Sequence, residues 1–477
     1  MGIIVAGFDL GCHIFCPFVH LQGLIGLAEA RADALGDDEQ SQEQDTAGQD
    51  HPVHDEDVRT GHDEVHVQQQ EERQRKAAET AAQREAEAQE SLKPKPAECT
   101  QFELNIYSAA AWHSFGENEE ILEQSRQFKS PELDHGLCNA YGLPVLSFRI
   151  QALDELAQLD EDDDAEAARN TMREKRIQQL LRHQIEQHAE TLWHVSSHLQ
   201  RSALYYDSEL ARQYRMHPAW TDPDYAEGEP EHSVPEQVAK LNLLNIHILL
   251  PENLVHHWAE SAREQMLRML AAEYSILPEQ IKIEHHFICQ DDAYSAWLKL
   301  LEQIAQQEHE CSLIINADSE IDQEWLDEQL WQTEQYIASE FAASWCAAGS
   351  KTSICGLAPR KTLKITLNEP QAAQFLQQNQ LNELAQLEQD QPFILMLDDA
   401  ADVRTAKKLQ RNFAETAVEM HHFLYTRKIF GDTQRVAKIF AFMLGMHLPE
   451  ELTGMVYSTD MDSAYAYFKA YPDEKYS

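Results

Sequence analysis

Residues 241–250 read LNLLNIHILL, an almost unbroken apolar run that predicts a buried strand. The runs IKIEHHFIC (281–289) and CSLIINAD (311–318) predict two more strands, and helical patterns at 252–274 and 293–308 separate the three. Strands that alternate with helices of this length are typical of layered proteins built on a mainly parallel sheet. The fold class that we predict is therefore α/β.

The same alternation extends along the chain in both directions. Towards the N-terminus, FELNIYSAAAW (102–112) and LPVLSFRI (143–150) predict strands, and a long helical pattern follows at 165–204. Towards the C-terminus, the pattern predicts four strands and four helices. These are strands at 338–349, 361–369, 392–399 and 453–459, and helices at 321–335, 370–387, 405–422 and 433–444.

The N-terminal part differs in composition from the rest. Residues 1–28 are apolar with Asp9 as the one formal charge. They are either a membrane anchor or a stretch that was assigned to the protein through a wrong start codon. An acidic, low-complexity stretch and an Ala/Glu/Gln/Arg-rich solvated helix follow, and they predict a disordered or helical arm. The predicted plan is an apolar segment 1–30, the arm 31–97, an α+β part 98–216, a Pro-rich linker 217–238 and an α/β body 239–477.

The charge balance limits the classes of partner. The 477 residues include 82 acidic and 38 basic side chains, for a formal net charge of −44. Nucleic acid is excluded as a main partner because phosphate binding needs a basic footprint, and we expect a basic or membrane-tethered protein partner instead. The eight scattered cysteines contain no CxxC pair, which favours the cytoplasm, with anchorage to the inner face of a membrane if residues 1–28 insert.

Two stretches resemble the thiolase / β-ketoacyl-synthase superfamily. The first, HECSLIINADSEIDQEWLDEQLWQTEQYIASEFAASWCAAG (309–349), has a buried strand, then Asp318-Ser319, a Trp-Leu helix and the pair Ser339-Glu340 ahead of a small-residue strand. The second, KIFGDTQRVAKIFAFMLGMHLPEELTGMVYSTDMDSAYAYF (428–468), has a Gly-led loop, an apolar helix and a final hairpin. The resemblance implies a thiolase-like α/β/α scaffold with mixed, mainly parallel, duplicated sheets, a bacterial protein and a homodimer.

The resemblance also implies where catalytic groups belong, and several are missing. The superfamily's nucleophilic cysteine lies at a helix N-terminus, and Cys289 is the candidate, with His285 or His286 as an unorthodox base. Asp291 and Asp292 follow it, and carboxylates disfavour the thiolate that acts as nucleophile. The position of a second-half histidine reads Gly431-Asp432, and the loop LDDAADVRT contains no histidine.

Other polar groups suggest weaker sites. Glu190, His194 and His198 recur at i, i+4 and i+8, so they share one helix face and are candidate zinc ligands, although a polar, solvated face explains them better. His51, His54, His62 and His66 in the acidic arm could bind a divalent metal weakly, although the composition of the arm explains them better. Asp398-Asp399 follows a strand and either binds a cation or caps the helix beginning near Val403. GxGxxG and GxxxxGK[ST] motifs are absent from the sequence, and we predict no cofactor.

These observations lead to a ranked set of functions. The first is a non-catalytic, thiolase-like pseudoenzyme that acts as an adaptor or assembly component through protein–protein binding. The alternative is a β-ketoacyl-synthase-like acyl transferase that uses Cys289. A second alternative is a His-rich metal-binding protein.

Overall fold

The chain divides into two units, and the computed structural model describes residues of the second, Lys95–Ser477. The predicted apolar segment and acidic arm, residues 1–97, lie outside the described residues, as does most of the predicted linker. Within the described ranges, none of the helices has the length and apolar character needed to cross a membrane. These ranges are 98–159, 171–215, 237–258, 260–289, 292–333, 336–388, 392–399, 402–426, 430–432, 436–449 and 451–471.

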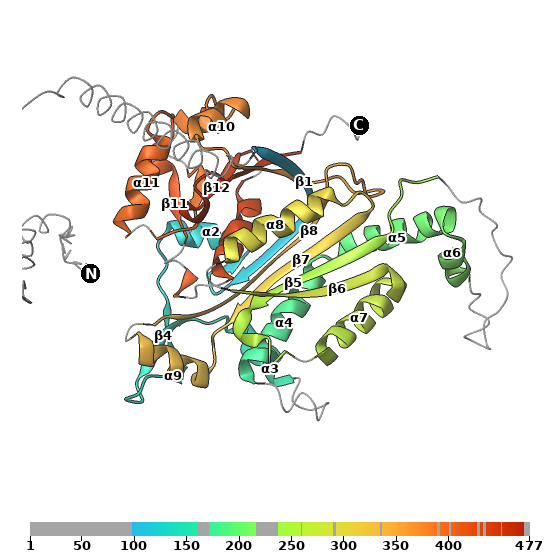
Figure 1. The fold of residues 1–477 in the computed structure, drawn as a ribbon. Helices are drawn as coiled ribbons and strands as arrows, with labels where there is room; N and C mark the ends of the chain where they lie inside the picture. The colour runs from blue at the N-terminus through green and yellow to red at the C-terminus, as the bar shows by residue number, and fades with distance from the viewer. Residues whose placement is uncertain are drawn as a thin grey trace, which may run out of the picture. The chain divides into compact units, whose positions relative to one another are not determined.

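The first half of the unit contains five strands of one sheet (Figure 1). Their spatial order is β6-β5-β7-β8-β1, and β8 runs antiparallel to the other four. The strands are β1 (Thr100–His113), β5 (Leu243–Pro251), β6 (Ile281–Ile288), β7 (Glu310–Ser319) and β8 (Ala338–Gly349). The predicted strands at 241–250, 281–289, 311–318 and 338–349 are thus confirmed.

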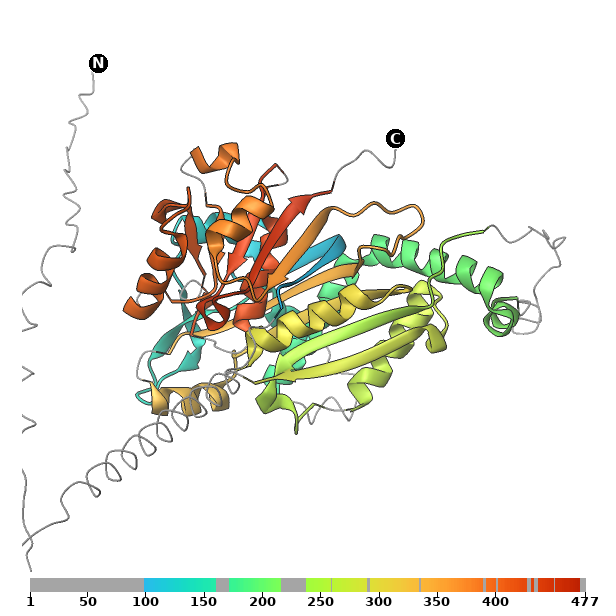
Figure 2. The ribbon, with the colours of Figure 1, turned by 45° about the horizontal axis from the view of Figure 1, so that its top comes forward.

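The second half repeats this arrangement. Its order is β11-β10-β12-β13-β9, and β13 is the strand that runs against the other four. The strands are β9 (Lys361–Leu367), β10 (Ile394–Met396), β11 (Phe423–Tyr425), β12 (Gly454–Tyr457) and β13 (Tyr465–Ala470). Because β1 pairs antiparallel with β9, the two halves join edge to edge, as Figure 2 shows. The mixed, mainly parallel and duplicated sheet that we predicted is confirmed.

The crossover helices occupy matching places in the two halves. In the first half, α7 (Glu260–Tyr274) links β5 to β6 and α8 (Ala293–Gln306) links β6 to β7. In the second, α11 (Val403–Phe413) links β10 to β11 and α12 (Ala437–Met443) links β11 to β12. The helix predicted at 370–387 is shorter than expected, since α10 ends at Gln378 (Ala372–Gln378).

Three hydrophobic cores lie between these layers. One core combines inner faces of both halves with α8 and α12, whose Trp297 and Phe442 rings meet edge to face at 5.7 Å. A second lies between the outer face of the first-half strands and helices that include α7, and a third between the second-half strands and α10 with α11. Helix and sheet layers therefore alternate as α/β/α/β/α, with α8 and α12 in the middle.

The long helix predicted at 165–204 is divided in two, which corrects that expectation. Helix α4 (Met172–Gln187) ends and α5 (Ala189–Tyr206) begins at His188. The buried His188 ring lies with Nδ1 2.6 Å from Ser108 Oγ on β1 and Nε2 2.7 Å from Ser344 Oγ on β8. The break therefore occurs where one side chain is bonded to the sheet, a contact that helical periodicity does not encode.

Buried charges bind α4 to the ends of the central strands. Glu340 at 0% exposure accepts hydrogen bonds from Arg176 Nε at 2.8 Å and Arg176 Nη2 at 2.6 Å. Arg173 Nη2 donates to Asp318 Oδ1 at 2.8 Å, and its guanidinium lies 4.4 Å from the Trp325 ring centroid. The acidic positions that we singled out from the sequence are thus ion-paired structural groups.

Candidate functional site

Cys289 lies just beyond β6, and α8 begins at Ala293 with Asp292 at its N-cap. The thiol is free and exposed. A thiolate is stabilised within the first turn of a helix, where backbone N–H groups converge. Cys289 precedes that turn, so the α8 N-terminus does not hold its sulfur in the way that the resemblance implies.

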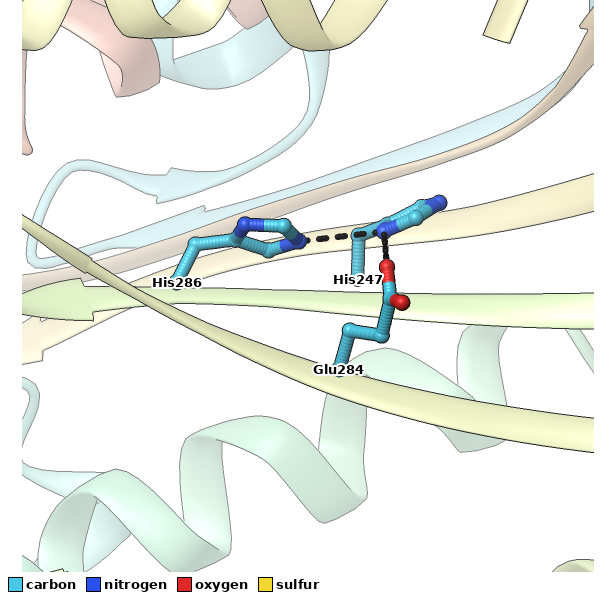
Figure 3. A group of neighbouring side chains, drawn as sticks. All are labelled: His247, Glu284 and His286. Carbon is cyan, nitrogen blue, oxygen red and sulfur yellow. Dashed lines mark hydrogen bonds and ion pairs between the residues drawn. The ribbon is translucent and has the colours of Figure 1, made fainter. Parts of the chain in front are cut away.

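The His285-His286 doublet divides across the sheet, because neighbouring residues of a strand point to opposite faces. The His285 ring contacts Trp258 at 6.0 Å and Phe287 at 6.4 Å between ring centroids. His286 projects from the opposite face, where its Nε2 lies 3.1 Å from His247 Nδ1 (Figure 3). The structure therefore brings together His286 and His247, a pair that the sequence reasoning missed.

Gly431-Asp432, at the place of the second catalytic histidine, has a backbone role. Gly431 has φ +87°, and a Cβ there would lie 2.8 Å from Ser339 Cβ. The Asp432 N–H donates to Ile337 O at 3.1 Å, and its Oδ2 accepts from the Ile337 N–H at 2.9 Å. These contacts join the loop to the segment that enters β8. Gly431 and Asp432 therefore have structural roles that require no catalytic function.

One imidazole lies between the two halves, although the sequence did not reveal it. His113 is 1% exposed, and its ring packs on Phe115, Phe148, Phe430 and Phe440 with centroid separations of 4.7, 5.3, 5.2 and 6.0 Å. Burial, with a contribution from the Lys129 charge, lowers its pKa to about 3. His113 is therefore neutral at pH 7 and enclosed by aromatic rings.

The aspartate that caps α11 is not one of the acidic pair after β10, which corrects our prediction. Asp402 is the N-cap of α11, and its side chain accepts from the Arg404 and Thr405 N–H groups. Asp398 instead accepts from Lys438 Nζ at 3.0 Å and Ser458 Oγ at 3.2 Å. The expectation of an aspartate cap at this helix was right, but the capping residue lies later in the loop than expected.

The candidate zinc ligands of α5 have different surroundings. Glu190 is exposed and His194 is half-buried beside Gly356. His198 is buried, and its Nε2 lies 2.7 Å from Ala239 O while Nδ1 accepts from the Cys355 N–H at 3.3 Å. Both His198 nitrogens are thus bonded to the backbone, so metal binding there would require breaking one of these contacts.

The clearest surface feature is a hairpin formed by β3 (Glu132–Cys138) and β4 (Pro144–Phe148). At its tip, Asn139 Oδ1 accepts hydrogen bonds from the Tyr141 and Leu143 N–H groups, both at 3.0 Å. Gly142 has φ +71°, a left-handed conformation that glycine adopts without strain. The local sequence therefore specifies an ordered turn that presents Tyr141 to solvent.

The hairpin is joined to α9 (Gln323–Gln332), which Figure 1 shows beside β4. Gln323 Nε2 donates to Cys138 O at 2.8 Å, and Gln323 Oε1 accepts from the Cys138 N–H at 2.9 Å. Beneath them, Leu137 and Leu326 share a small buried core. Hairpin and helix thus form one supported element.

Five large apolar side chains of this element face solvent, and we call them the hairpin surface. Trp331 is 91% exposed and Tyr141 is 87% exposed. Leu133 and Leu146 are cross-strand partners, and both are exposed. Tryptophan and tyrosine often dominate the binding energy of protein interaction sites. The members are Leu133, Tyr141, Leu143, Leu146 and Trp331.

A polar cavity of about 780 Å³ lies beside the hairpin. At its wall, Arg149 forms ion pairs at 2.8 Å with both Asp134 and Asp154. These central charges are compensated within the chain.

Comparison of the sequence with known protein families and with curated proteins finds no match. Solved structures give a distant likeness of fold. The ishigamide ketosynthase/chain length factor is 10% identical with a TM-score of 0.39, covering 76% of this chain and 98% of that one. A bacillaene-synthase module 1 ketosynthase from Bacillus amyloliquefaciens is 8% identical with a TM-score of 0.41, covering 78% and 76%. Xanthomonas campestris OleA is 9% identical with a TM-score of 0.34, covering 77% and 96%.

Proposed function

We propose that this chain is a non-catalytic protein on a thiolase-like scaffold, and that it binds a basic protein through the hairpin surface. The observation that carries the proposal is the exposure of Trp331 and Tyr141 on an ordered element. An exposed tryptophan loses contact with water when a partner covers it, and such residues commonly contribute most of the binding energy. This exposure supports the proposed adaptor role of the hairpin surface.

The absence of catalysis is supported by the positions that a condensing enzyme would use. Cys289 precedes the first turn of α8 rather than lying in it. Asp432 is bonded to the Ile337 backbone. His113, the imidazole between the halves, is enclosed by phenylalanine rings. Asp432 and His113 therefore have structural contacts, and Cys289 lacks the position in a helix N-terminal turn that would stabilise a thiolate.

The charge of the partner is inferred from the groups around the hairpin surface. Helix α9 carries three exposed acids, Glu324, Asp327 and Glu328, on the same element as Trp331. The chain as a whole has a formal net charge of −44. Such a field accelerates association with basic proteins and repels acidic ones. The partner that fits is a basic protein with an apolar contact patch.

The compartment belongs to the same proposal. The six cysteines in the described part of the chain are free, although Cys311 and Cys346 have their sulfurs only 3.5 Å apart. Reduced, closely spaced thiols fit a reducing compartment. We therefore place the interaction in the cytoplasm.

The test uses the full chain with the photoreactive residue benzoylphenylalanine in place of Trp331. After irradiation in the native cells, mass spectrometry identifies what is crosslinked. Trp193, which is 52% exposed on α5, supplies a matched control position. We expect a basic protein to be captured at position 331 and not at 193. Capture of the chain itself, capture of an acidic protein, or equal capture at both positions would contradict the proposal.

The purified pair then gives a quantitative test. Trp331→Ala should weaken binding by about 30-fold, the loss of roughly 2 kcal/mol that defines a hot spot. Glu328→Lys should slow association most at low salt, because salt screens charges near the interface. Glu264→Lys, on the exposed part of α7, is the control for net charge. Equal effects of Glu328→Lys and Glu264→Lys would contradict a local electrostatic contribution.

A further inference from the structure

Three potential metal-binding side chains converge on one face of the β5–β6 pair, away from the hairpin surface. His247 of β5 lies directly opposite Glu284 of β6 in the parallel register. His286 is two residues beyond Glu284, so it projects from the same face. Figure 3 shows both rings and the carboxylate directed towards one another. Two strands joined through α7 thus bring together two imidazoles and one carboxylate.

Protein atoms do not satisfy every hydrogen-bonding group of these three side chains. His247 Nδ1 lies 3.1 Å from His286 Nε2 and 3.4 Å from Glu284 Oε2. A ring nitrogen either donates its proton or accepts one, while a carboxylate only accepts, so Nδ1 cannot serve both neighbours at full strength. In addition, His247 Nε2 is buried and has no hydrogen-bond partner in the described part of the chain. A structural histidine pair would satisfy these groups more completely.

The spacing matches that of metal ligands. One donor atom from each residue lies within 4.8 Å of the others. Tetrahedral zinc with bonds of about 2.0–2.1 Å separates its ligand atoms by about 3.3 Å. The two separations at His247 Nδ1, 3.1 and 3.4 Å, bracket that value. Two of the three donor separations therefore already match tetrahedral zinc, and the third is no longer than 4.8 Å.

The donor types and their charges select the class of ion. Two imidazoles with one carboxylate suit first-row transition metals such as Zn²⁺, whereas Ca²⁺ and Mg²⁺ prefer oxygen donors alone. An imidazole binds a metal through a nitrogen that carries no proton. Lys282 Nζ contacts Glu284 Oε1 at 2.6 Å, which leaves Oε2 facing the rings.

Access is compatible with an open coordination position. His247 is 4% exposed, whereas the Glu284 side chain is 37% exposed. Strand β6 lies at the edge of the sheet, so the outer side of the group is not covered by a further strand. A metal here would have one buried ligand, two ligands nearer the surface, and a remaining position open to water or a small anion.

We propose that His247, Glu284 and His286 form a binding site for one first-row transition-metal dication, with Zn²⁺ the ion that the ligands and spacing fit. The site is distinct from the one expected on α5, and it does not depend on the proposed protein interaction. Since the ligands belong to adjacent strands, the ion would link β5 to β6 at the sheet edge.

The experiment titrates ZnCl2 into the full chain after chelator treatment, using calorimetry, with Co²⁺ absorption as a report of tetrahedral coordination. We expect one tight equivalent per chain in addition to weaker binding by the histidine-rich arm. His286→Gln and Glu284→Gln change half-buried positions and should leave the fold intact, as circular dichroism can verify. Each variant should weaken zinc binding at the tight site by on the order of 100-fold. Removing a group that merely supports a metal ligand costs up to about that much affinity, so the loss of a ligand should cost at least as much.

His194→Gln is the matched control, because His194 is also a half-buried histidine and belongs to the α5 candidate site. It should leave the tight class unchanged. Three results would overturn the proposal: no tight equivalent in the wild-type chain, a tight class that survives both His286→Gln and Glu284→Gln in folded protein, or a tight class lost in His194→Gln.

Discussion

Glu340→Gln tests whether the buried charges at the start of β8 stabilise the fold as strongly as their geometry indicates. The Glu340 carboxylate is fully buried and accepts from four donors. Two belong to Arg176, at 2.6 and 2.8 Å, and the others are the Ile150 N–H at 2.5 Å and Ser319 Oγ at 2.9 Å. Glutamine retains the volume but removes the charge and turns one acceptor into a donor.

The magnitude follows from what remains around Arg176. Arg176 is 1% exposed. After the substitution its remaining carboxylate partner is Asp154, which lies 2.5 Å away and has a side chain that is 38% exposed. Removing one partner of a buried ion pair leaves a poorly compensated charge and costs about 3–5 kcal/mol. With Asp154 still present, we expect the free energy of unfolding to fall by about 3 kcal/mol, at the lower end of that range.

The assay is urea unfolding followed by circular dichroism, which reports the midpoint and its slope. Glu308→Gln is the control, because Lys351 and Glu308 form a pair of the same length, 2.8 Å, with side chains 78% and 58% exposed. Exposed pairs contribute little, so this midpoint should not move measurably. The double variant Arg176→Gln/Glu340→Gln should be less destabilised than the sum of its single variants. If Glu340→Gln and Glu308→Gln unfold at the same urea concentration, the reasoning about burial is refuted.

Three further results are expected. Gly431→Ala should lower the free energy of unfolding by about 2 kcal/mol, since its new Cβ meets neighbouring atoms at 2.8–2.9 Å. Gly142→Ala is the control, because its Cβ would have no atom within 4 Å, and thermal melting should show a smaller loss of stability for it. Iodoacetamide at neutral pH should alkylate Cys289 as slowly as exposed Cys99 in peptide mapping, and selective labelling of Cys289 would instead favour an acyl-transfer enzyme. The pKa of His113 is lowered to about 3 in the folded protein, so as the pH falls below 6.5 this histidine is protonated in the unfolded chain but not in the folded one. The free energy of unfolding should therefore fall by about 1.4 kcal/mol for each pH unit below 6.5. His113→Phe should show a shallower pH dependence by that amount, and an unchanged slope would contradict the assignment.

The order and type of most elements could be predicted from the sequence. Strand β8 was predicted as 338–349 and forms Ala338–Gly349, and all twelve of its residues are buried although Ser339, Glu340 and Ser344 are polar. The alternation of apolar runs with amphipathic segments depends only on residues near in sequence. The same local reasoning missed β11, whose three residues carry too short a pattern, and β3, whose sequence ELDHGLC contains a glycine and several polar residues.

The sites required the tertiary structure. The isolated His247 in an apolar run and the Glu284–His286 spacing were visible, but their meeting depends on the register of two strands joined through α7. Exposure of Trp331 depends on the packing of α9 against the hairpin, since a tryptophan in an amphipathic helix is equally compatible with a buried position.

What the sequence determined by itself was the α/β alternation and the acidic net charge, because composition and periodicity are local properties. The tertiary structure decided the duplicated strand order, the break at His188 and the grouping of His247 with Glu284 and His286. These features arise from contacts between residues far apart in the chain. Their geometry is set when strands pair and layers pack, and it is therefore not encoded in any single stretch of residues.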